Sequence, residues 1–358
     1  MTMTNGRPQA MRSLGRIGLW GAPGCGKTTF LASLNIAVSR SAAQELMIFG
    51  VDDASTTFLV ENTARLTSDR QFPDATQTGS QYSWVLRMET QVPERRMFRR
   101  QTTATVPLEL NLDLLDEPGR VFRDVPQEPA PAAAGGGGGD LGFDDDEDTP
   151  ADAGLGIPMA DEENVMDQLA SCDGLLLLFD PTREWEGGDA FNYFQGTLLR
   201  IAQRRMIGQA TPGGRLPHYV AVCATKFDNP DVYRRAKNRG YRSFSVEDPY
   251  MFPRVPDELA EKFFVELVRQ SERGNADLVA NALRRYFEPD RVRFFVTSAI
   301  GFFKSHKAAR FQEADFMNIV RQQDGSFQIR GAIHPINVVE PLVWLGQSLA
   351  ASDRWRAS

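Results

Sequence analysis

Residues 21–28 read GAPGCGKT, and they directly follow the short apolar run IGLW at residues 17–20. The spacing GxxxxGKT is typical of a loop that wraps a phosphate group, because its glycines let backbone N–H groups turn inward. Residues 27–38 favour a helix, whose positive N-terminal end attracts an anion. This order of strand, loop and helix predicts a nucleoside triphosphate site.

The residues of this loop have distinct expected roles. Lys27 is expected to reach the β- and γ-phosphates, and the Thr28 hydroxyl is expected to ligate a Mg²⁺ ion that bridges them. Pro23 removes one backbone donor and adds stiffness close to the γ-phosphate. The predicted nucleotide contacts in this stretch are Gly21, Ala22, Pro23, Gly24, Cys25, Gly26, Lys27, Thr28 and Thr29.

A second polar segment follows a predicted strand further along the chain. Residues 108–114 alternate leucine with polar residues, which is typical of a half-buried strand, and they lead into DEPG at residues 116–119. A doubly wound sheet places its ligand contacts at such strand ends. We therefore expect Asp116 to hold Mg²⁺ and the Gly119 N–H to meet the γ-phosphate.

Two more strand ends carry residues suited to a purine base. Residues 219–224 lead into TKFD at residues 225–228, and residues 292–296 lead into TSA at residues 297–299. An aspartate at residue 228 can accept hydrogen bonds from the N1 and N2 donors of guanine, which adenine lacks. The backbone of TSA would meet the guanine O6. The predicted contacts are Thr225, Lys226, Asp228, Ser298, Ala299 and Ile300.

Taken in order along the chain, these segments resemble the G1, G3, G4 and G5 motifs of Ras-like GTPases, with Thr225 where asparagine is commoner. The resemblance implies an α/β P-loop NTPase fold, a three-layer sandwich around a mostly parallel central sheet. It also implies a molecular switch that binds GTP and GDP with Mg²⁺. More narrowly, the layout is similar to the bacterial double-GTPase proteins, which implies companion proteins in bacterial signalling or conflict systems.

The first switch of such a protein should supply a threonine to Mg²⁺ ahead of the DEPG strand. Residues 45–51 predict an extra strand and residues 54–69 a helix, and the polar segment 72–78 follows them. We choose Thr76 over Thr78, because a threonine shortly after a proline turn matches the switch of related bacterial GTPases. Plain loop hydroxyls are the alternative for both residues.

The residue after DEPG bears on catalysis. Many Ras-like proteins have a water-orienting glutamine there, whereas this chain has Arg120. We therefore expect slow hydrolysis that a partner protein stimulates, with Arg120 either neutralising transition-state charge or forming a plain ion pair. Two alternatives stay open, a P-loop ATPase that uses Glu117 to activate water and a scaffold that binds GTP without hydrolysing it. TKFD has no role in the first.

The 358 residues contain one phosphate loop and no internal repeat, which predicts a single domain over residues 14–350 after a flexible tail, residues 1–13. Residues 126–163 hold eleven acidic residues and no Lys or Arg, so this insertion is predicted to be disordered. Removing it takes the formal net charge from −7 to +4, so the acidity says little about partners. The insertion is either a spacer or an acidic lure for a basic partner or for the arginines of residues 95–100.

The last part of the chain is predicted to be a helical insertion, a hairpin and a final helix. Within residues 229–290, two apolar helix stripes pack on their own domain, or Phe263 and Phe264 face a partner. Residues 316–330 contain a hairpin signal at Asp324 and Gly325. Asn337 and Glu340 are expected to cap the final helix.

Composition excludes several other classes of protein. The three cysteines, an odd number, suit reduced thiols and a cytoplasmic location. The three histidines are scattered along the sequence, so they predict no metal site in addition to the nucleotide-bound Mg²⁺. No apolar run is long enough to be a transmembrane segment. The arginines of residues 95–100 are too few, and too poor in aromatic neighbours, to predict direct nucleic-acid binding. The expected partners are a guanine nucleotide and a protein activator or effector.

Overall fold

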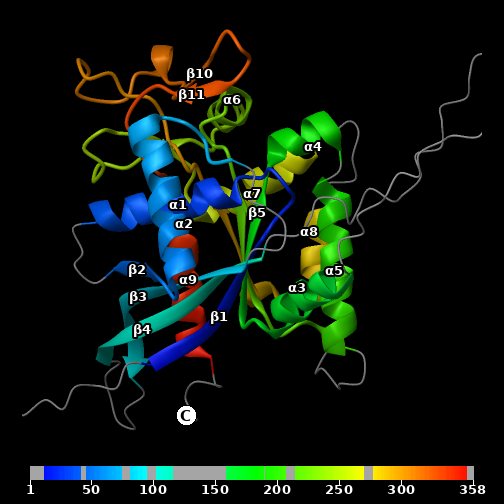
Figure 1. Cartoon of the computed structure of the whole chain (residues 1–358). Helices are drawn as coiled ribbons and strands as arrows, with labels where there is room; N and C mark the ends of the chain where they lie inside the picture. The colour runs from blue at the N-terminus through cyan, green and yellow to red at the C-terminus, as the bar shows by residue number, and fades with distance from the viewer. Residues whose placement is uncertain are drawn as a thin grey trace, which may run out of the picture.

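The computed structural model is built around one seven-stranded sheet in the order β2-β3-β4-β1-β5-β6-β9 (Figure 1). The structure describes residues 12–41, 46–74, 81–94, 102–115, 159–188, 190–206, 214–269 and 277–352. The strands are β1 Arg12–Trp20, β2 Met47–Gly50, β3 Gln81–Glu94, β4 Thr102–Leu115, β5 Gly174–Phe179, β6 Tyr219–Ala224 and β9 Val292–Val296. Strands β4, β1, β5, β6 and β9 pair parallel, whereas β3 pairs antiparallel with both β2 and β4, so β3 alone runs against the others. The predicted mostly parallel α/β sheet is confirmed.

Helices cover both faces of the sheet and make a three-layer sandwich. One face carries α1 Lys27–Arg40, α2 Asp53–Ala64 with its π-helical extension Arg65–Asp69, and α9 Glu340–Ala351. The other carries α3 Met159–Ser171, α5 Ala190–Met206, α7 Asp257–Val268 and α8 Asp277–Tyr286. Helices α4 Pro181–Gly187 and α6 Pro230–Asn238 lie beyond the carboxyl ends of β5 and β6, at the top of Figure 1.

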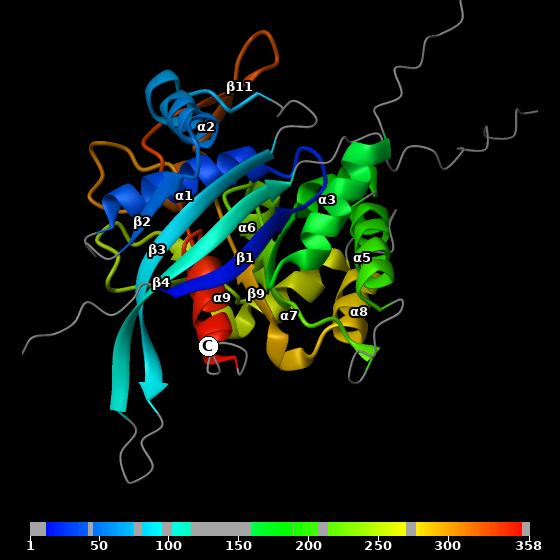
Figure 2. The same cartoon turned by 60° about the horizontal axis from the view of Figure 1, so that its bottom comes forward.

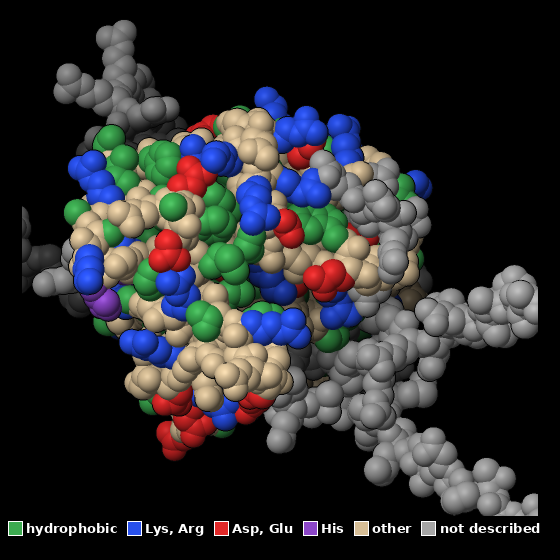
Figure 3. Space-filling model, turned by 90° about the horizontal axis from the view of Figure 1, so that it is seen from above, with side chains coloured by type: hydrophobic (Ala, Val, Ile, Leu, Met, Phe, Trp, Pro, Cys, Tyr) green, Lys and Arg blue, Asp and Glu red, His purple; other side chains and the backbone are tan. Residues whose placement is uncertain are grey.

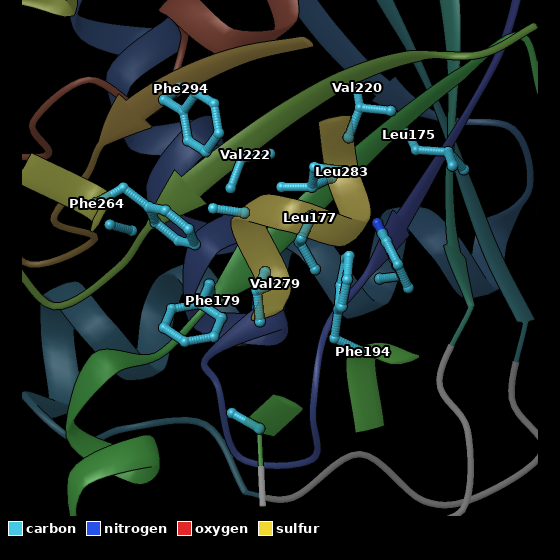
Figure 4. Packing of buried hydrophobic residues seen from close by; sticks show 14 of the residues in the cluster. Leu175, Leu177, Phe179, Phe194, Val220, Val222, Phe264, Val279, Leu283 and Phe294 are labelled. Atoms are coloured by element: carbon cyan, nitrogen blue, oxygen red, sulfur yellow. The ribbon is translucent and has the colours of Figure 1, made fainter. Parts of the chain in front are cut away.

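The central strands are apolar throughout because both of their faces are buried. In β5, Leu175 and Leu177 pack into the cluster beneath α5 and α8, whereas Leu176 and Leu178 pack into the cluster beneath α1 and α9. Such unbroken apolar runs are typical of parallel strands covered by helices on both sides. Figure 4 shows the first cluster, in which side chains of β5, β6 and β9 meet those of α5, α7 and α8.

Helix α7 belongs to this core. Phe263 and Phe264 are at most 1% exposed, and the ring of Phe264 lies 5.1 Å from those of both Phe179 and Phe294. The alternative that these two phenylalanines face a partner is therefore wrong. The packing of both stripes on their own domain is confirmed, although Leu278 of α8 is 40% exposed.

The hairpin of β3 and β4 reaches beyond the rest of the sheet. The two strands pair from Gln81 opposite Leu115 to Glu94 opposite Thr102, whereas β1 meets β4 only from Leu108 onward. The outer part is a two-stranded arm that projects away from the helices (Figure 2). The arginines of residues 95–100 lie outside the described residues.

Short elements complete the chain after α6. They are β7 Ser243–Phe244, β8 Pro253–Arg254, β10 Ile319–Arg321 and β11 Phe327–Ile329, with 3₁₀ turns at Pro289–Arg291 and Glu313–Asp315. Strands β10 and β11 pair antiparallel, so the hairpin predicted around Asp324 and Gly325 is confirmed, with shorter strands.

Two sequence-based expectations differ from the structure. Helix α3 begins at Met159, inside the segment predicted to be disordered. Composition alone misses this helix, because acidic residues in a first turn favour the helix N-terminus as well as disorder. The predicted cap of the final helix is wrong for Asn337, since Val339 is the N-cap of α9 and the Asn337 side chain donates instead to the Val296 carbonyl at 3.3 Å. Glu340 does accept from the N-cap N–H of Val339, at 3.2 Å.

Candidate functional site

The carboxyl ends of the parallel strands bring the predicted motifs to one edge of the sheet. Trp20 ends β1 opposite Leu177 of β5, and Phe179 ends β5 opposite Ala224 of β6. Ala224 in turn lies opposite Val296, the last residue of β9. Strands β2, β3 and β4 lie on one side of β1, and β5, β6 and β9, which come later in the chain, lie on the other side. The strand order therefore reverses between β1 and β5. Open α/β sheets bind ligands at such a reversal point.

The loop of residues 21–26 is shaped by glycines that a side chain would disturb. A Cβ added to Gly21 would lie 2.5 Å from the carbonyl oxygen of Leu178, so a larger residue collides with β5. Gly26 is the N-cap of α1 with φ at 96°, and no side chain caps the helix. A Cβ added to Gly26 would meet no atom within 4 Å, so the helix start faces open space. An open helix N-terminus beside a glycine loop fits a phosphate.

The first turn of α1 carries the predicted cation and hydroxyls. Lys27 is 6% exposed, and its Nζ donates to the Gly21 carbonyl at 3.0 Å, across the loop. Thr28 and Thr29 are half-buried in the same turn. The nine predicted residues therefore form one continuous stretch, with residues 21–26 between β1 and α1 and Lys27, Thr28 and Thr29 in the first turn of α1, whereas their contacts with phosphate and Mg²⁺ remain predictions.

The TKFD segment is fixed by its neighbours on both sides. The backbone N–H and the hydroxyl of Thr225 both donate to the Phe179 carbonyl, at 2.9 and 3.2 Å. Lys226 has φ at 56°, a left-handed conformation that costs a residue with a side chain about 1 kcal/mol. Phe227 is fully buried, and its N–H donates to the Thr297 carbonyl at 3.0 Å. These contacts determine where Asp228 points.

Asp228 and Ser298, from two different motifs, meet at this edge. The Ser298 hydroxyl donates to Asp228 Oδ1 at 2.5 Å and accepts a hydrogen bond from the Gly301 N–H at 2.8 Å. Burial raises the pKa of Asp228, against the opposing effects of the Ser298 hydrogen bond and the Lys226 charge. A carboxylate in such a poorly solvated position gains from additional N–H donors.

The backbone groups of Ser298, Ala299 and Ile300, which follow β9, have different surroundings. The Ser298 N–H donates to the Ile336 carbonyl at 3.0 Å, and the Ile336 N–H donates to the Ser298 carbonyl at 2.8 Å. The backbone groups of Ser298 are therefore occupied by contacts within the protein. Ile300 is buried, and its carbonyl accepts from the His334 N–H at 3.1 Å. Ala299 lies half-buried between them. With the Ser298 N–H occupied, the contact of the Ala299 and Ile300 backbone with guanine O6 remains a prediction.

Sequence reasoning missed a polar group that follows β5. Asp180 is 2% exposed, and its Oδ2 pairs with Lys226 Nζ at 2.5 Å. Thr182 Oγ1 donates to the same carboxyl group at 2.8 Å. Arg183 donates from Nη1 to the Pro23 carbonyl in the phosphate loop. The signal was present, because DPTR at residues 180–183 follows a buried strand in the same manner as TKFD and TSA.

Four predicted site residues lie outside the described residues. They are Thr76, Asp116, Gly119 and Arg120. Strand β4 is described to Leu115, and its Leu114 lies opposite Leu19 of β1. DEPG therefore follows a strand that adjoins the phosphate-loop strand, and its roles remain predictions.

All three cysteines are buried, and none of them forms a disulfide. Burial raises the pKa of Cys172 to about 12 and that of Cys223 well above its usual range. A thiol that stays protonated is a poor nucleophile. Cys172 and Cys223 therefore act as core residues, and the site chemistry lies elsewhere.

Figure 3 looks onto the end of the molecule where these loops gather. Lys and Arg side chains are spread across the visible face, with Asp and Glu side chains among them. Within the described part of the chain, no group of three or more His, Cys, Asp or Glu residues could hold a metal ion. No helix among the same residues is both long and apolar enough to span a membrane.

Comparisons with known proteins add little to this geometry. No protein-family model matches the chain, and no curated protein matches it. Among solved structures, Sup35 complexed with GDP is 12% identical with a TM-score of 0.30, over 81% of this chain and 38% of that one. The S. cerevisiae Ski7 GTPase-like domain bound to GTP is 11% identical with a TM-score of 0.34, over 94% and 50%. The chain thus spans half or less of the length of these structures.

Proposed function

We propose that this protein binds GTP and GDP with Mg²⁺ and acts as a molecular switch that hydrolyses GTP slowly. The observation that carries the proposal is the Asp228 carboxyl group, held by Ser298 at the sheet edge that also bears the phosphate loop. Guanine brings two N–H donors to such a carboxylate, whereas adenine would leave it without them. The fixed Thr225 and Phe227 backbone supports this role, because it limits the movement of Asp228.

Mg²⁺ is expected to bind Thr28, with Asp116 and Thr76 as further ligands. Hydroxyl and carboxylate oxygens are ligands that Mg²⁺ prefers, and the bound ion neutralises charge on the phosphates. Support comes from the position of Thr28 in the first turn of α1, directly after Lys27. The ATPase alternative with Glu117 as base has no comparable support from the described residues, because it gives Asp228 no task.

Slow turnover is proposed because Arg120 stands where a water-orienting glutamine is common. The Gly119 N–H would meet the γ-phosphate, and an activating protein would supply the missing catalytic group. We further propose that the switch works in the cytoplasm with a protein effector, in bacterial signalling or conflict systems.

The test is a titration with fluorescent GTP and Mg²⁺, in competition with unlabelled GTP, GDP and ATP. In Asp228→Ala we expect at least about tenfold weaker guanine-nucleotide binding and no preference over ATP, because hydrogen bonds to a charged group are lost. Asp231→Ala is the matched control, since Asp231 is exposed on α6 and pairs only at the surface with Arg234. Equal displacement by ATP and GTP, or indifference to Asp228, contradicts the proposal.

A further inference from the structure

Arg183 contacts the middle of the phosphate loop from a different part of the chain. Its Nη1 donates to the Pro23 carbonyl, 160 residues away in sequence. A Cβ added to Gly24 would lie 3.8 Å from the same nitrogen, so the guanidinium group lies against both residues. Pro23 and Gly24 form the part of the loop where we expect the γ-phosphate. A permanent positive charge therefore stands next to the proposed site of the terminal phosphate.

The helix that carries Arg183 is firmly anchored. Oδ1 of Asp180 accepts from the Thr182 N–H at 2.9 Å and from the Arg183 N–H at 3.4 Å, so the buried carboxylate caps α4 directly beneath the arginine. Glu184, which is fully buried, accepts from the N–H groups of Ala190 and Phe191 at the start of α5, at 3.0 and 3.3 Å. Groups fixed before the ligand arrives need little reorganisation to stabilise charge.

We propose that Arg183 contacts the terminal phosphate of the bound nucleoside triphosphate and neutralises its charge during hydrolysis. This inference rests on the proposed function. In that reaction the oxygen of water bonds to the γ-phosphorus while the bond to the β,γ-bridging oxygen breaks. The electron pair leaves with GDP, and the proton lost by water passes to the released phosphate. A guanidinium group beside the γ-phosphate stabilises the charge that spreads over its oxygens.

The test compares Arg183→Ala and Arg183→Lys with the wild type. Arg234→Ala is the matched control, because Arg234 is an exposed arginine on α6 that pairs with Asp231 of the same helix. Affinity is measured for GDP and for a β,γ-imido analogue of GTP, and the hydrolysis rate is measured in a single turnover. We expect Arg183→Ala to lose at least about tenfold in affinity for the analogue, with a much smaller change for GDP. The rate should fall about 100-fold, and Arg183→Lys should recover part of both losses.

The outcomes separate this inference from the proposed function. Equal weakening of GDP and analogue would show that Arg183 only shapes the loop, and unchanged affinities with an unchanged rate would show no role; either result overturns the inference. A wild type that prefers ATP contradicts the guanine proposal alone, and the Arg183 comparison is then made with ADP and the imido analogue of ATP. A wild type that binds no nucleotide contradicts both.

Discussion

At the scale of single residues, the site contains a strained backbone and a buried carboxyl group, each stabilised by a neighbouring side chain. Lys226 adopts a left-handed backbone conformation, and its ammonium group pairs with the buried Asp180. Asp228 has a raised pKa from burial and is held by Ser298. Strained backbone and shifted pKa values cluster at functional sites, because binding groups must be held where folding alone would not favour them.

His334 is a residue outside this site whose ionisation should affect stability. Burial and, less strongly, the charges of Arg40 and Lys304 lower the pKa of His334 from 6.5 to about 4, against the opposing effect of Asp248. The unfolded chain takes up a proton below pH 6.5 while folded His334 stays neutral, so the free energy of unfolding falls as the pH drops from 6.5 to about 4. The loss from this group is at most about 3 kcal/mol.

Chemical unfolding of wild type and His334→Phe across this pH range checks the prediction. The variant has no group to protonate, so its stability should fall less steeply than that of the wild type. His306→Phe serves as the control, since His306 is exposed. Parallel curves for the wild type and His334→Phe would show that the histidine does not contribute.

At the scale of secondary structure, two helices offer a matched pair of aspartate caps. Asp52 caps α2 by accepting from the Ser55 N–H at 2.7 Å and is exposed. Asp180 caps α4, is 2% exposed, and also holds Lys226. The same residue type therefore has a local role in one helix, whereas in the other it also joins α4 to the TKFD segment.

We expect Asp180→Ala to destabilise the protein by about 3 kcal/mol, because it removes a cap and leaves Lys226 without its buried partner. Asp52→Ala should have a clearly smaller effect. Asp180→Asn keeps the cap but loses the charge, so its stability should lie between those of wild type and Asp180→Ala. Denaturant titration measures all three, and equal losses for the Asp52 and Asp180 variants would contradict the argument.

At the scale of the whole molecule, a bound nucleotide would connect loops that follow β1, β5, β6 and β9. A ligand that binds only the folded state stabilises it, by about 2.7 kcal/mol at about 100 times its dissociation constant. We expect GDP with Mg²⁺ to raise the melting temperature, ADP to have less effect, and EDTA to reduce the gain. Asp228→Ala should abolish the difference between GDP and ADP. Equal shifts with both nucleotides in the wild type would argue against guanine selection.

Much of the fold was predictable because its signals are local. The strands at residues 219–224 and 292–296 were predicted at their observed bounds, since unbroken apolar runs ending in polar residues are typical of covered parallel strands. The start of α3 was not predicted, because acidic residues suit both a helix N-terminus and a disordered segment. The N-cap of α9 was not predicted either, because an Asn side chain can bond to several kinds of backbone group. In the candidate site, the motifs were predictable, whereas the use of the Ser298 backbone by Ile336 was not.

The sequence by itself determined the phosphate loop, the strand–loop–helix order around it and the residues that follow each strand, because glycine spacing and apolar periodicity act over a few residues. Only the tertiary structure decided which of these residues meet. Asp228 lies 70 residues from Ser298, and Arg183 lies 160 residues from Pro23. Such contacts depend on the pairing of parallel strands, which a short stretch of sequence does not encode.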